Sequence, residues 1–543
     1  MIETMSNVDN FWLQMDEPTN LMVITGFMEL EKPMEYEHLC RLFEDRLLRF
    51  PRFKQKVVKS GPGMPSWVTD RQFDIRSHVH RVALPEPGGK KEFQTMTGDL
   101  MGMPLDITKP LWQCHLIENV GGGCALFFRI HHCIGDGIAL IHVLLSMADT
   151  KDGAPLIDAK PPKPKKKNSK SVFSFDGFKG AVKKVQTLAS KTGDFVKEEI
   201  QKAKANPSHV GDLVRIGGEL GFDVGSLAFK LLLKPSDPKT SFKGKLGIRK
   251  CAAWGESMSL EDIKTIGKAL GATVNDVLIG TMTGALRYYL QQRNNRVNEL
   301  DLRVAVPVNI RRPGTEFELG NKFSLIFLSL PVYIQDPILR IREVKRRMDT
   351  LKHSPEAFVG FQILNTIGAL PTSVAKNLAY YVANKATGVL TNVPGPKQPL
   401  YFGDQQIKNM MFWVPRSGQV GLGISILSYN NTVTIGFASD ELLVPDPDVI
   451  ITGFKEEFEF LFDFVQSGKM DNQTLVLNDR YMESMESMES MQKTEESVAL
   501  SYTGMKRCMA MTKSGRQCRN LVLHGSQYCY VHKPNTIENY FME

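Results

Sequence analysis

The sequence predicts an α/β fold built from two successive segments. Residues 1 to about 150 alternate apolar runs of strand length with helical patterns, and a second segment from about 240 to 468 repeats that alternation. Between them stands a stretch rich in proline and lysine, which cannot bury a core. Two such segments fit a chain of 543 residues, because single cores usually stop growing at roughly 250–300 residues.

In the first segment, assigned to residues 1–157, two strands and two helices are the clearest elements. Apolar runs of strand length predict strands at 21–30 and 124–130, and helical patterns stand at 36–50 and 137–149.

The middle region, residues 158–239, reads as a lysine-rich linker followed by a helical insertion. Residues 160–204 hold thirteen lysines against four acidic residues, with Phe173, Phe175 and Phe178 among them. Two interpretations stay open. The stretch either packs on the protein or stays partly disordered, or it lies on an anionic membrane with its aromatic rings inserted.

The second segment, residues 240–468, ends in a hairpin and a helix. Strands are predicted at 301–310, 324–334, 421–430 and 431–439, and an amphipathic helix at 447–465. Asn430 and Asn431 predict the turn of a hairpin between the last two strands.

Composition and charge describe a soluble protein. Hydrophobic residues make up 42% and charged residues 23%, and the net charge is +8. The amino-terminal residues lack the pattern of a secretory signal, and no uncharged apolar run is long enough to span a bilayer. Cys40, Cys114, Cys124, Cys133 and Cys251 stand among apolar neighbours, as thiols of a reducing compartment do. We therefore expect a cytoplasmic protein.

The stretch "RIHHCIGDGIAL", residues 129–140, carries the candidate chemistry. Consecutive strand residues face opposite sides, so His131 and His132 do not share one cavity; one does the chemistry and the other supports it. An imidazole can take a proton from a hydroxyl group. Asp136 is placed to cap the following helix or to hold the turn through a buried ion pair, and Gly137 to allow a tight turn.

Two core histidines beside a capping aspartate remain the alternative interpretation of this stretch. The chain contains no G-x-S-x-G, no G-x-x-x-x-G-K-[ST] and no H-E-x-x-H sequence. Direct transfer with a general base is the enzymatic interpretation that remains.

"HHCIGDG" resembles the HHxxxDG signature of the acyltransferases that include chloramphenicol acetyltransferase, condensation domains and the bacterial wax ester synthase/diacylglycerol acyltransferases. Further stretches are similar to blocks of the last family and occur in its order. They are "MSNVDNFWLQMDEPTNLMVI", "KPLWQCHLI" with Pro110, Leu111 and Trp112, "GATVNDVLIG" with Asn275 and Asp276, "VPVNIRRP", "LGNKFS" and "TNVPGP".

The resemblance implies two chloramphenicol acetyltransferase-like subdomains with the catalytic histidine in a tunnel at their junction. It implies that His132 deprotonates a fatty alcohol or a diacylglycerol, whose oxygen then attacks the thioester of an acyl-CoA. Acyl-CoA is a substrate in this scheme, and no catalytic cofactor is expected.

The same resemblance suggests roles for the remaining motif residues. Asp136 is structural, and Arg311 is a candidate partner for it. Asn275 is either a donor to the tetrahedral oxyanion or the cap of the helix that follows, and its neighbour Asp276 is assigned to substrate binding. Pro110, Leu111 and Trp112 either shape an acyl channel or pack in the core.

The carboxyl-terminal region exceeds the family pattern. Residues 469–503 are too poor in apolar side chains to fold alone and are read as a tether. Residues 504–535 contain Cys508, Cys518, Cys529 and His532, which suit a closed tetrahedral zinc site. Free thiols or a disulfide are the other interpretation.

The predicted partners are acyl-CoA, a fatty alcohol or diacylglycerol, and the surface of the inner membrane or of a lipid droplet. No nucleic acid is expected for the core. Two rival functions stay open: transfer to another hydroxylated acceptor, and a noncatalytic lipid-surface protein. The oligomeric state is not predicted.

Overall fold

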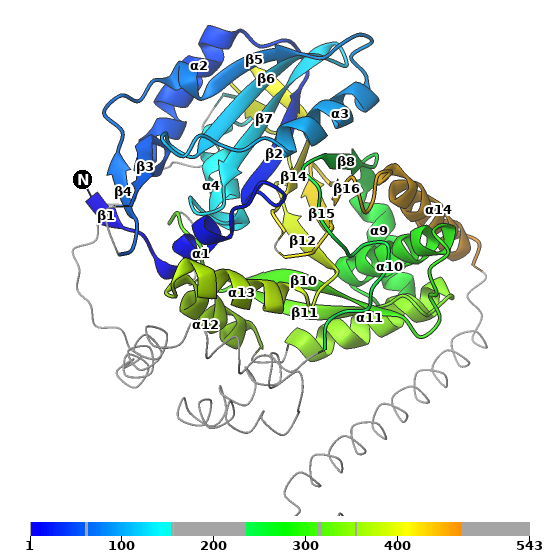
Figure 1. The fold of residues 1–543 in the computed structure, drawn as a ribbon. Coiled ribbons are helices and arrows are strands. Elements are labelled where there is room, and N and C mark those ends of the chain that lie inside the picture. Colours follow the sequence, from blue (N-terminus) through cyan, green and yellow to red (C-terminus); the bar gives the residue numbers. More distant parts are fainter. Residues whose placement is uncertain are drawn as a thin grey trace, which may run out of the picture. The chain divides into compact units, whose positions relative to one another are not determined.

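Two mixed β-sheets form the core of the fold (Figure 1), as seen in a computed structural model. The structure describes residues 2–59, 63–153, 156, 235–311, 318–352, 356–416 and 418–468. Nearly all of the predicted 158–239 insertion lies outside these ranges. The predicted tether 469–503 and the four predicted zinc ligands Cys508, Cys518, Cys529 and His532 also lie outside them.

The first sheet has six strands. Its order combines strands of the first segment, residues 1–157, with strands of the second segment, residues 240–468; these two segments are called the first and second half below. Only the pair β5·β6 is parallel; the other neighbours are antiparallel. In order across the sheet, the strands are β13 (Tyr401–Phe402), β14 (Gln405–Trp413), β2 (Val23–Leu30), β7 (Gly123–His131), β6 (Trp112–Val120) and β5 (Val79–Ala83).

The second sheet has seven strands, all from the second segment, residues 240–468. Six follow one path across the sheet and β9 pairs with β16 at its side. They are β11 (Phe323–Pro331), β10 (Asp301–Asn309), β12 (Gly388–Pro394), β15 (Leu422–Tyr429), β16 (Thr432–Asp440), β8 (Lys250–Trp254) and β9 (Met258–Ser259).

A third, small sheet stands near the amino terminus. Its strands are β1 (Ile2–Thr4), β4 (Ser66–Thr69) and β3 (Gln55–Val58). The described helices are α1 (Asn7–Met15), α2 (Tyr36–Asp45), α3 (Lys90–Met101), α4 (Gly137–Met147), α9 (Leu260–Leu270), α10 (Val274–Gln292), α11 (Pro337–Lys352), α12 (Glu356–Gly368), α13 (Thr372–Ala383) and α14 (Asp448–Gln466).

The elements predicted from the sequence are present with shifted ends. The predicted strands correspond to β2, β7, β10, β11, β15 and β16, and the predicted helices to α2, α4 and α14. The turn between β15 and β16 has positive φ at both Asn430 and Asn431, 48° and 59°. A type I′ turn requires positive φ at both of its central residues, so the predicted hairpin turn is confirmed.

Strand β14 of the second half completes the sheet of the first half. It pairs with β2 from Ile407 opposite Leu30 to Trp413 opposite Thr25. The sequence analysis did not predict this exchange, because hydrophobic periodicity marks a strand but not its partner. The first sheet therefore depends on residues from both segments.

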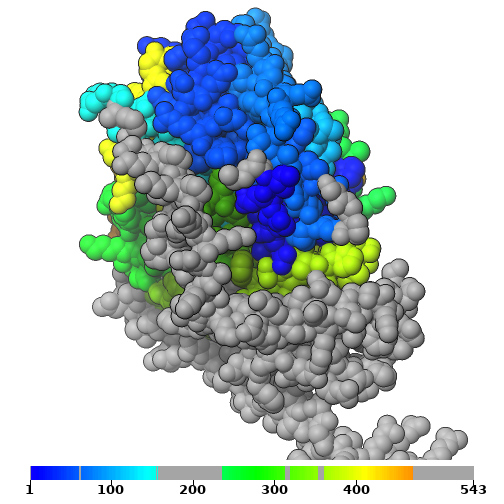
Figure 2. Space-filling model, turned by 90° about the vertical axis from the view of Figure 1, so that its left-hand side faces the viewer, coloured from blue at the N-terminus to red at the C-terminus, as the bar shows by residue number. Residues whose placement is uncertain are grey.

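Helices α1, α12 and α13 bring the two halves together next to the sheets. Figure 1 shows α1 beside α12 and α13. Figure 2 shows the dark blue amino-terminal residues between the blue residues of the first half and the yellow-green residues of the second. On the second sheet, the apolar side chains of Ala305 and Phe327 pack with Ala386, which follows α13.

The first sheet has different neighbours on its two faces. One face packs with α1, α2 and α4 in the largest hydrophobic cluster. The other face packs against α3, whose Phe93 lies near Trp254 of β8. Lys250 of β8 also donates a hydrogen bond of 2.7 Å to the carbonyl oxygen of Thr19. The halves are thus joined at several places besides β14.

None of the helices in the described ranges combines the length and the hydropathy that crossing a bilayer requires.

Candidate active site

A strand, a tight turn and a helix position the histidine pair. β7 ends at His131, whose backbone N–H donates to the Leu111 carbonyl oxygen at 2.9 Å. The next N–H, that of His132, donates to the Met22 carbonyl oxygen at 2.8 Å. Helix α4 then begins at Gly137, with Asp136 as its N-cap. These hydrogen bonds hold the backbone of both histidines in place.

The side chain of His132 faces an apolar cavity of about 420 Å³. Residues of both halves line it, including Trp12, Gly137, Phe323, Ile363, Asn392 and Phe412. His132 is 4% exposed, and its imidazole stacks on the Trp12 indole, with ring centroids 4.1 Å apart and planes at 11°. The ring of Phe323 lies 5.5 Å away.

Burial controls the protonation of His132. Desolvation lowers the pKa of His132 to about 4, although the negative charge of Asp136 opposes this shift. The imidazole is therefore neutral at pH 7, and a neutral imidazole is the form that can accept a proton.

His131 lies outside the lining of this cavity. Its Nδ1 accepts a hydrogen bond of 3.1 Å from the Cys133 backbone N–H. Its Nε2 lies 3.8 Å from a carboxylate oxygen of Asp16. The two histidines thus do not share one cavity, as expected: His132 lines it from the turn after β7, and His131 lies against the backbone at the end of the strand.

Asp136 and Arg311 form a buried ion pair. Their side chains are 5% and 1% exposed, and Nη1 of Arg311 donates to Oδ2 of Asp136. The same oxygen accepts from the Lys322 backbone N–H at 2.8 Å, and Oδ1 accepts from the Ala139 backbone N–H at 3.1 Å. Asp136 therefore caps α4 and holds the turn through an ion pair, so both functions expected of it occur together.

The structure gives no support to the expected role of Gly137 as the residue of a tight turn. Gly137 is the first residue of α4, and positive φ is not found there. An added Cβ at this position would meet no atom within 4 Å. The missing side chain instead leaves open space beside the cavity.

Asn321 supports the backbone of His132 from the second half of the chain. Its Nδ2 donates to the His132 carbonyl oxygen at 2.7 Å and to Asp9 Oδ1 at 2.8 Å. The Asn321 backbone N–H also donates to Asp9 Oδ1, at 3.1 Å. The sequence analysis missed both residues, although they stand in two of the quoted blocks, "MSNVDNFWLQ" and "LGNKFS".

Asn275 does not line the cavity, and the expectation that it caps the helix is wrong. The N-cap of α10 is Thr273, and Asn275 is an exposed residue of the first turn. Its Oδ1 accepts a hydrogen bond of 2.7 Å from Nδ2 of Asn392. Asn392 does line the cavity, and it stands in the quoted block "TNVPGP". Asn275 thus contacts the site through Asn392.

Asp276 lies in the cap of α10 rather than in the cavity lining. Its Oδ2 accepts from the backbone N–H of Thr273 at 2.8 Å and from the hydroxyl of Thr273 at 2.7 Å. This capping box uses the carboxylate that the sequence analysis assigned to substrate binding. The structure gives that assignment no support.

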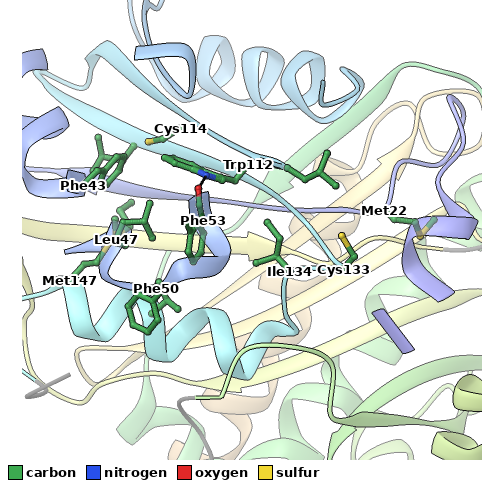
Figure 3. Close-up of a cluster of buried hydrophobic side chains, with 14 of the residues drawn as sticks. Met22, Phe43, Leu47, Phe50, Phe53, Trp112, Cys114, Cys133, Ile134 and Met147 are labelled. Carbon is green, nitrogen blue, oxygen red and sulfur yellow. Dashed lines mark hydrogen bonds between the residues drawn. The ribbon is translucent and has the colours of Figure 1, made fainter. Parts of the chain in front are cut away.

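Of Pro110, Leu111 and Trp112, only Trp112 lines one of the two cavities described here. All three are buried. Trp112 lines a second cavity, of about 110 Å³, and its Nε1 donates to the Phe53 carbonyl oxygen at 2.8 Å, the dashed line in Figure 3. Leu111 acts through its backbone, as the acceptor for His131.

No cluster of three or more histidine, cysteine, aspartate or glutamate side chains suited to a metal ion occurs within the described ranges. The predicted zinc ligands lie beyond these ranges, so the zinc site stays a prediction.

Comparison with known proteins assigns the family. The profile of the wax ester synthase/diacylglycerol acyltransferase catalytic domain matches residues 5–278, and that of the WS/DGAT C-terminal domain matches residues 319–461. The chain belongs to the wax ester synthase/diacylglycerol acyltransferase family. The predicted resemblance and the predicted class of enzyme, an O-acyltransferase of this family, are thereby confirmed.

Curated members of the family match most of the chain. A putative diacylglycerol O-acyltransferase of Mycobacterium tuberculosis is 27% identical over 486 residues, which cover 85% of this chain and 90% of the relative. The O-acyltransferase WSD of Acinetobacter baylyi is 28% identical over 482 residues, covering 82% of this chain and 97% of the relative.

Solved structures agree on the fold. The wax ester synthase/diacylglycerol acyltransferase of Marinobacter aquaeolei matches with a TM-score of 0.60 at 20% identity, covering 86% of this chain and all of that one. The first condensation domain of the calcium-dependent antibiotic synthetase matches with a TM-score of 0.52 at 14% identity, covering 86% and 96%. The predicted two-part fold, similar to condensation domains, is confirmed.

Proposed function

We propose that the protein transfers a fatty acyl group from acyl-CoA to the hydroxyl of a long-chain alcohol or a diacylglycerol, with His132 as general base. The observation that carries this proposal is the buried imidazole of His132 in an apolar cavity lined by both halves of the chain, where desolvation lowers its pKa. The names of the relatives, diacylglycerol O-acyltransferase and O-acyltransferase WSD, support the same reaction.

The reaction needs one base and no covalent acyl-enzyme. The His132 imidazole takes the proton of the acceptor hydroxyl, while the oxygen of that hydroxyl forms a bond to the thioester carbon. The tetrahedral intermediate then collapses, the carbon–sulfur bond breaks, and the leaving thiolate takes the proton from the imidazolium. The products are an ester and free coenzyme A.

Asn392 is the candidate donor to the tetrahedral oxyanion. It lines the same cavity as His132. One of its N–H bonds is used by Asn275, and an amide nitrogen has a second N–H to give. We propose that Asn275 holds the amide of Asn392 in the orientation that directs this second N–H at the reacting carbonyl. A well-placed donor of this kind is worth about 3 kcal/mol in the transition state.

An acyl-transfer assay tests the base. Purified protein is incubated with palmitoyl-CoA and either hexadecanol or a diacylglycerol, and both free thiol and neutral lipid are measured. We expect product from the wild type and a loss of about a thousandfold or more in His132→Ala. The control is His115→Gln, which alters a buried histidine of β6 outside the cavity lining. Near-normal transfer by folded His132→Ala would refute the mechanism.

The same assay ranks the acceptors. Hexadecanol and diacylglycerol are compared by kcat/KM, and a panel of other hydroxylated compounds covers the rival acceptors. If no acceptor yields an ester and acyl-CoA stays intact, a noncatalytic lipid-surface protein becomes the better interpretation.

We further propose that the enzyme works at the surface of a membrane or lipid droplet and that residues 160–204 attach it there. Their thirteen lysines against four acidic residues support attraction to anionic lipid. Deletion of 160–204 should weaken binding to anionic liposomes at low salt, whereas deletion of 469–503 serves as the control. Unchanged flotation with liposomes at low and high salt would refute the attachment.

A further inference from the structure

Helix α1 turns two side chains towards the turn that carries His132. Asp9 and Trp12 stand three residues apart, so they lie on the same face of the helix. Trp12 stacks on the imidazole of His132. Asp9 is buried, at 6% exposure, and its carboxylate contacts Asn321 of the second half. The two side chains thus reach the same histidine by different routes, Trp12 directly and Asp9 through Asn321.

The partners of Asn321 fix the orientation of its amide group. Nδ2 donates to Oδ1 of Asp9 at 2.8 Å and to the carbonyl oxygen of His132 at 2.7 Å. Oδ1 of Asp9 also accepts the backbone N–H of Asn321, at 3.1 Å, so this oxygen has no proton to give. A flipped amide would set its own oxygen against these two acceptors. The amide nitrogen therefore faces them, and Oδ1 of Asn321 points elsewhere.

Two buried polar atoms at this place have complementary needs. Oδ1 of Asn321 and Nδ1 of His132 are both buried, and neither has a direct hydrogen-bond partner among the described residues. An unpaired buried polar atom costs free energy, an amide oxygen can only accept, and an imidazole Nδ1 that carries a proton donates. The two side chains also interact: desolvation lowers the pKa of His132, and hydrogen bonding with the Asn321 side chain is among the effects that raise it.

We infer that Asp9 and Asn321 are positioning residues that keep the proton of the neutral His132 imidazole on Nδ1. Asp9 holds the Asn321 amide, and Oδ1 of Asn321 accepts the Nδ1–H. Nε2 is then the unprotonated nitrogen, the one that can take the proton of an acceptor hydroxyl. Asp136 does not supply this contact, because its carboxylate oxygens bond to Arg311 and to two backbone N–H groups. The inference rests on the proposed acyl transfer, with His132 as its base.

Nitrogen-15 NMR of protein labelled in its histidines measures the tautomer directly, because protonated and unprotonated ring nitrogens differ widely in chemical shift. His132→Ala identifies the signals of His132 by difference. Burial lowers the pKa of His132 to about 4, so the spectrum at pH 7 reports the neutral ring. We expect a protonated Nδ1 and an unprotonated Nε2 in the wild type. A proton on Nε2 would overturn the inference.

Variants of the two positioning residues test the contacts. Asp9→Leu and Asn321→Ser should each give a mixture of tautomers and lower kcat by about tenfold, the ratio that one ordinary hydrogen bond corresponds to, with little change in KM. Asp9→Asn keeps an acceptor oxygen and should retain most of kcat. Asn10→Leu is the matched control. Asn10 is also a buried residue of α1, but its Nδ2 donates to the Gly368 carbonyl oxygen, at 2.9 Å, and not towards His132.

The tautomer is measured without substrate, so this inference and the proposed reaction fail separately. Absence of ester from the wild type with every acceptor would overturn the reaction alone. An unchanged tautomer in Asp9→Leu and Asn321→Ser would overturn the inference whatever the kinetics. The same holds if Asn10→Leu alters the tautomer and kcat as much as Asp9→Leu does, since the effect would then come from a general loosening of α1. If Asp9→Leu does not fold, Asn321→Ser decides.

Discussion

The indole ring of Trp12 lies flat against the imidazole of His132, with centroids 4.1 Å apart and an angle of 11° between the planes. Phe323 also lies near the imidazole, with ring centroids 5.5 Å apart. These aromatic neighbours keep the imidazole in one orientation, while Asn321 and Met22 hold its backbone. The base is thereby oriented before substrate binds.

Loss of the Trp12 ring should slow the chemical step. Aromatic pairs contribute about 0.5–1.5 kcal/mol beyond their buried area, so Trp12→Leu should lower kcat by about threefold to tenfold. Trp12→Phe keeps a ring in contact with the imidazole and should retain most of the activity. Steady-state kinetics with both variants provides the measurement, and equal kcat in Trp12→Leu and wild type would contradict this role.

The acid limb of the pH profile should lie below the usual range for histidine. Burial lowers the pKa of His132 to about 4, so the neutral form persists as the pH falls through 6.5 and is lost only near the lowered pKa. We expect kcat/KM to stay constant between about pH 8 and 5.5 and to fall below that range. Circular dichroism at each pH controls for unfolding. An acid limb centred near pH 6.5 would show that His132 is more hydrated than the structure indicates.

Breaking the ion pair of Asp136 and Arg311 should destabilise the fold. Arg311→Met leaves a buried carboxylate without its counter-ion, which typically costs about 3–5 kcal/mol. Urea denaturation of the wild type, Arg311→Met, Asp136→Asn and the double variant measures the coupling between the two side chains. We expect the double variant to lose less stability than the sum of the single losses. Strict additivity would mean that the pair contributes nothing as a pair.

Asn392 and Asn275 should affect kcat to different degrees. If Asn392 donates to the oxyanion, Asn392→Ala lowers kcat by about 100-fold or more with little change in KM. Asn275→Ala removes only the 2.7 Å bond that positions Asn392, so its loss should be smaller. Asp276→Ala serves as the comparison. It breaks a capping box and should cost about 1 kcal/mol of stability while kcat stays normal.

Local patterns were sufficient to predict the strand, turn and helix around His132. Alternation along the predicted strand led to the expectation that His131 and His132 face different sides, and Asn430 with Asn431 marked a hairpin because both residues tolerate positive φ. These features depend on neighbours in the chain. The residues that determine these features therefore lie within a few positions of them in the sequence.

Contacts between distant residues could not be predicted in the same way. Asn392, Asn321 and Trp12 each reach the site from a different part of the chain, and no periodicity indicates which strand or helix faces His132. The interpretation of Asp276 failed for a different reason. This polar residue of a family motif was assigned to substrate binding, although it bonds to Thr273, only three residues away in the chain. The quoted motifs contain the residues that lie around His132, but only the fold shows which of their side chains reach the cavity.

The exchange of β14 determines when the first half of the chain can finish folding. β2 is an interior strand only because Gln405–Trp413 lies beside it. During synthesis on the ribosome, β2 must remain a sheet edge until that distant strand has emerged, and an exposed edge invites pairing with other chains. Folding of the newly made amino-terminal half alone therefore ends in an incomplete sheet, and the nascent chain is most exposed to aggregation before residue 413 leaves the exit tunnel.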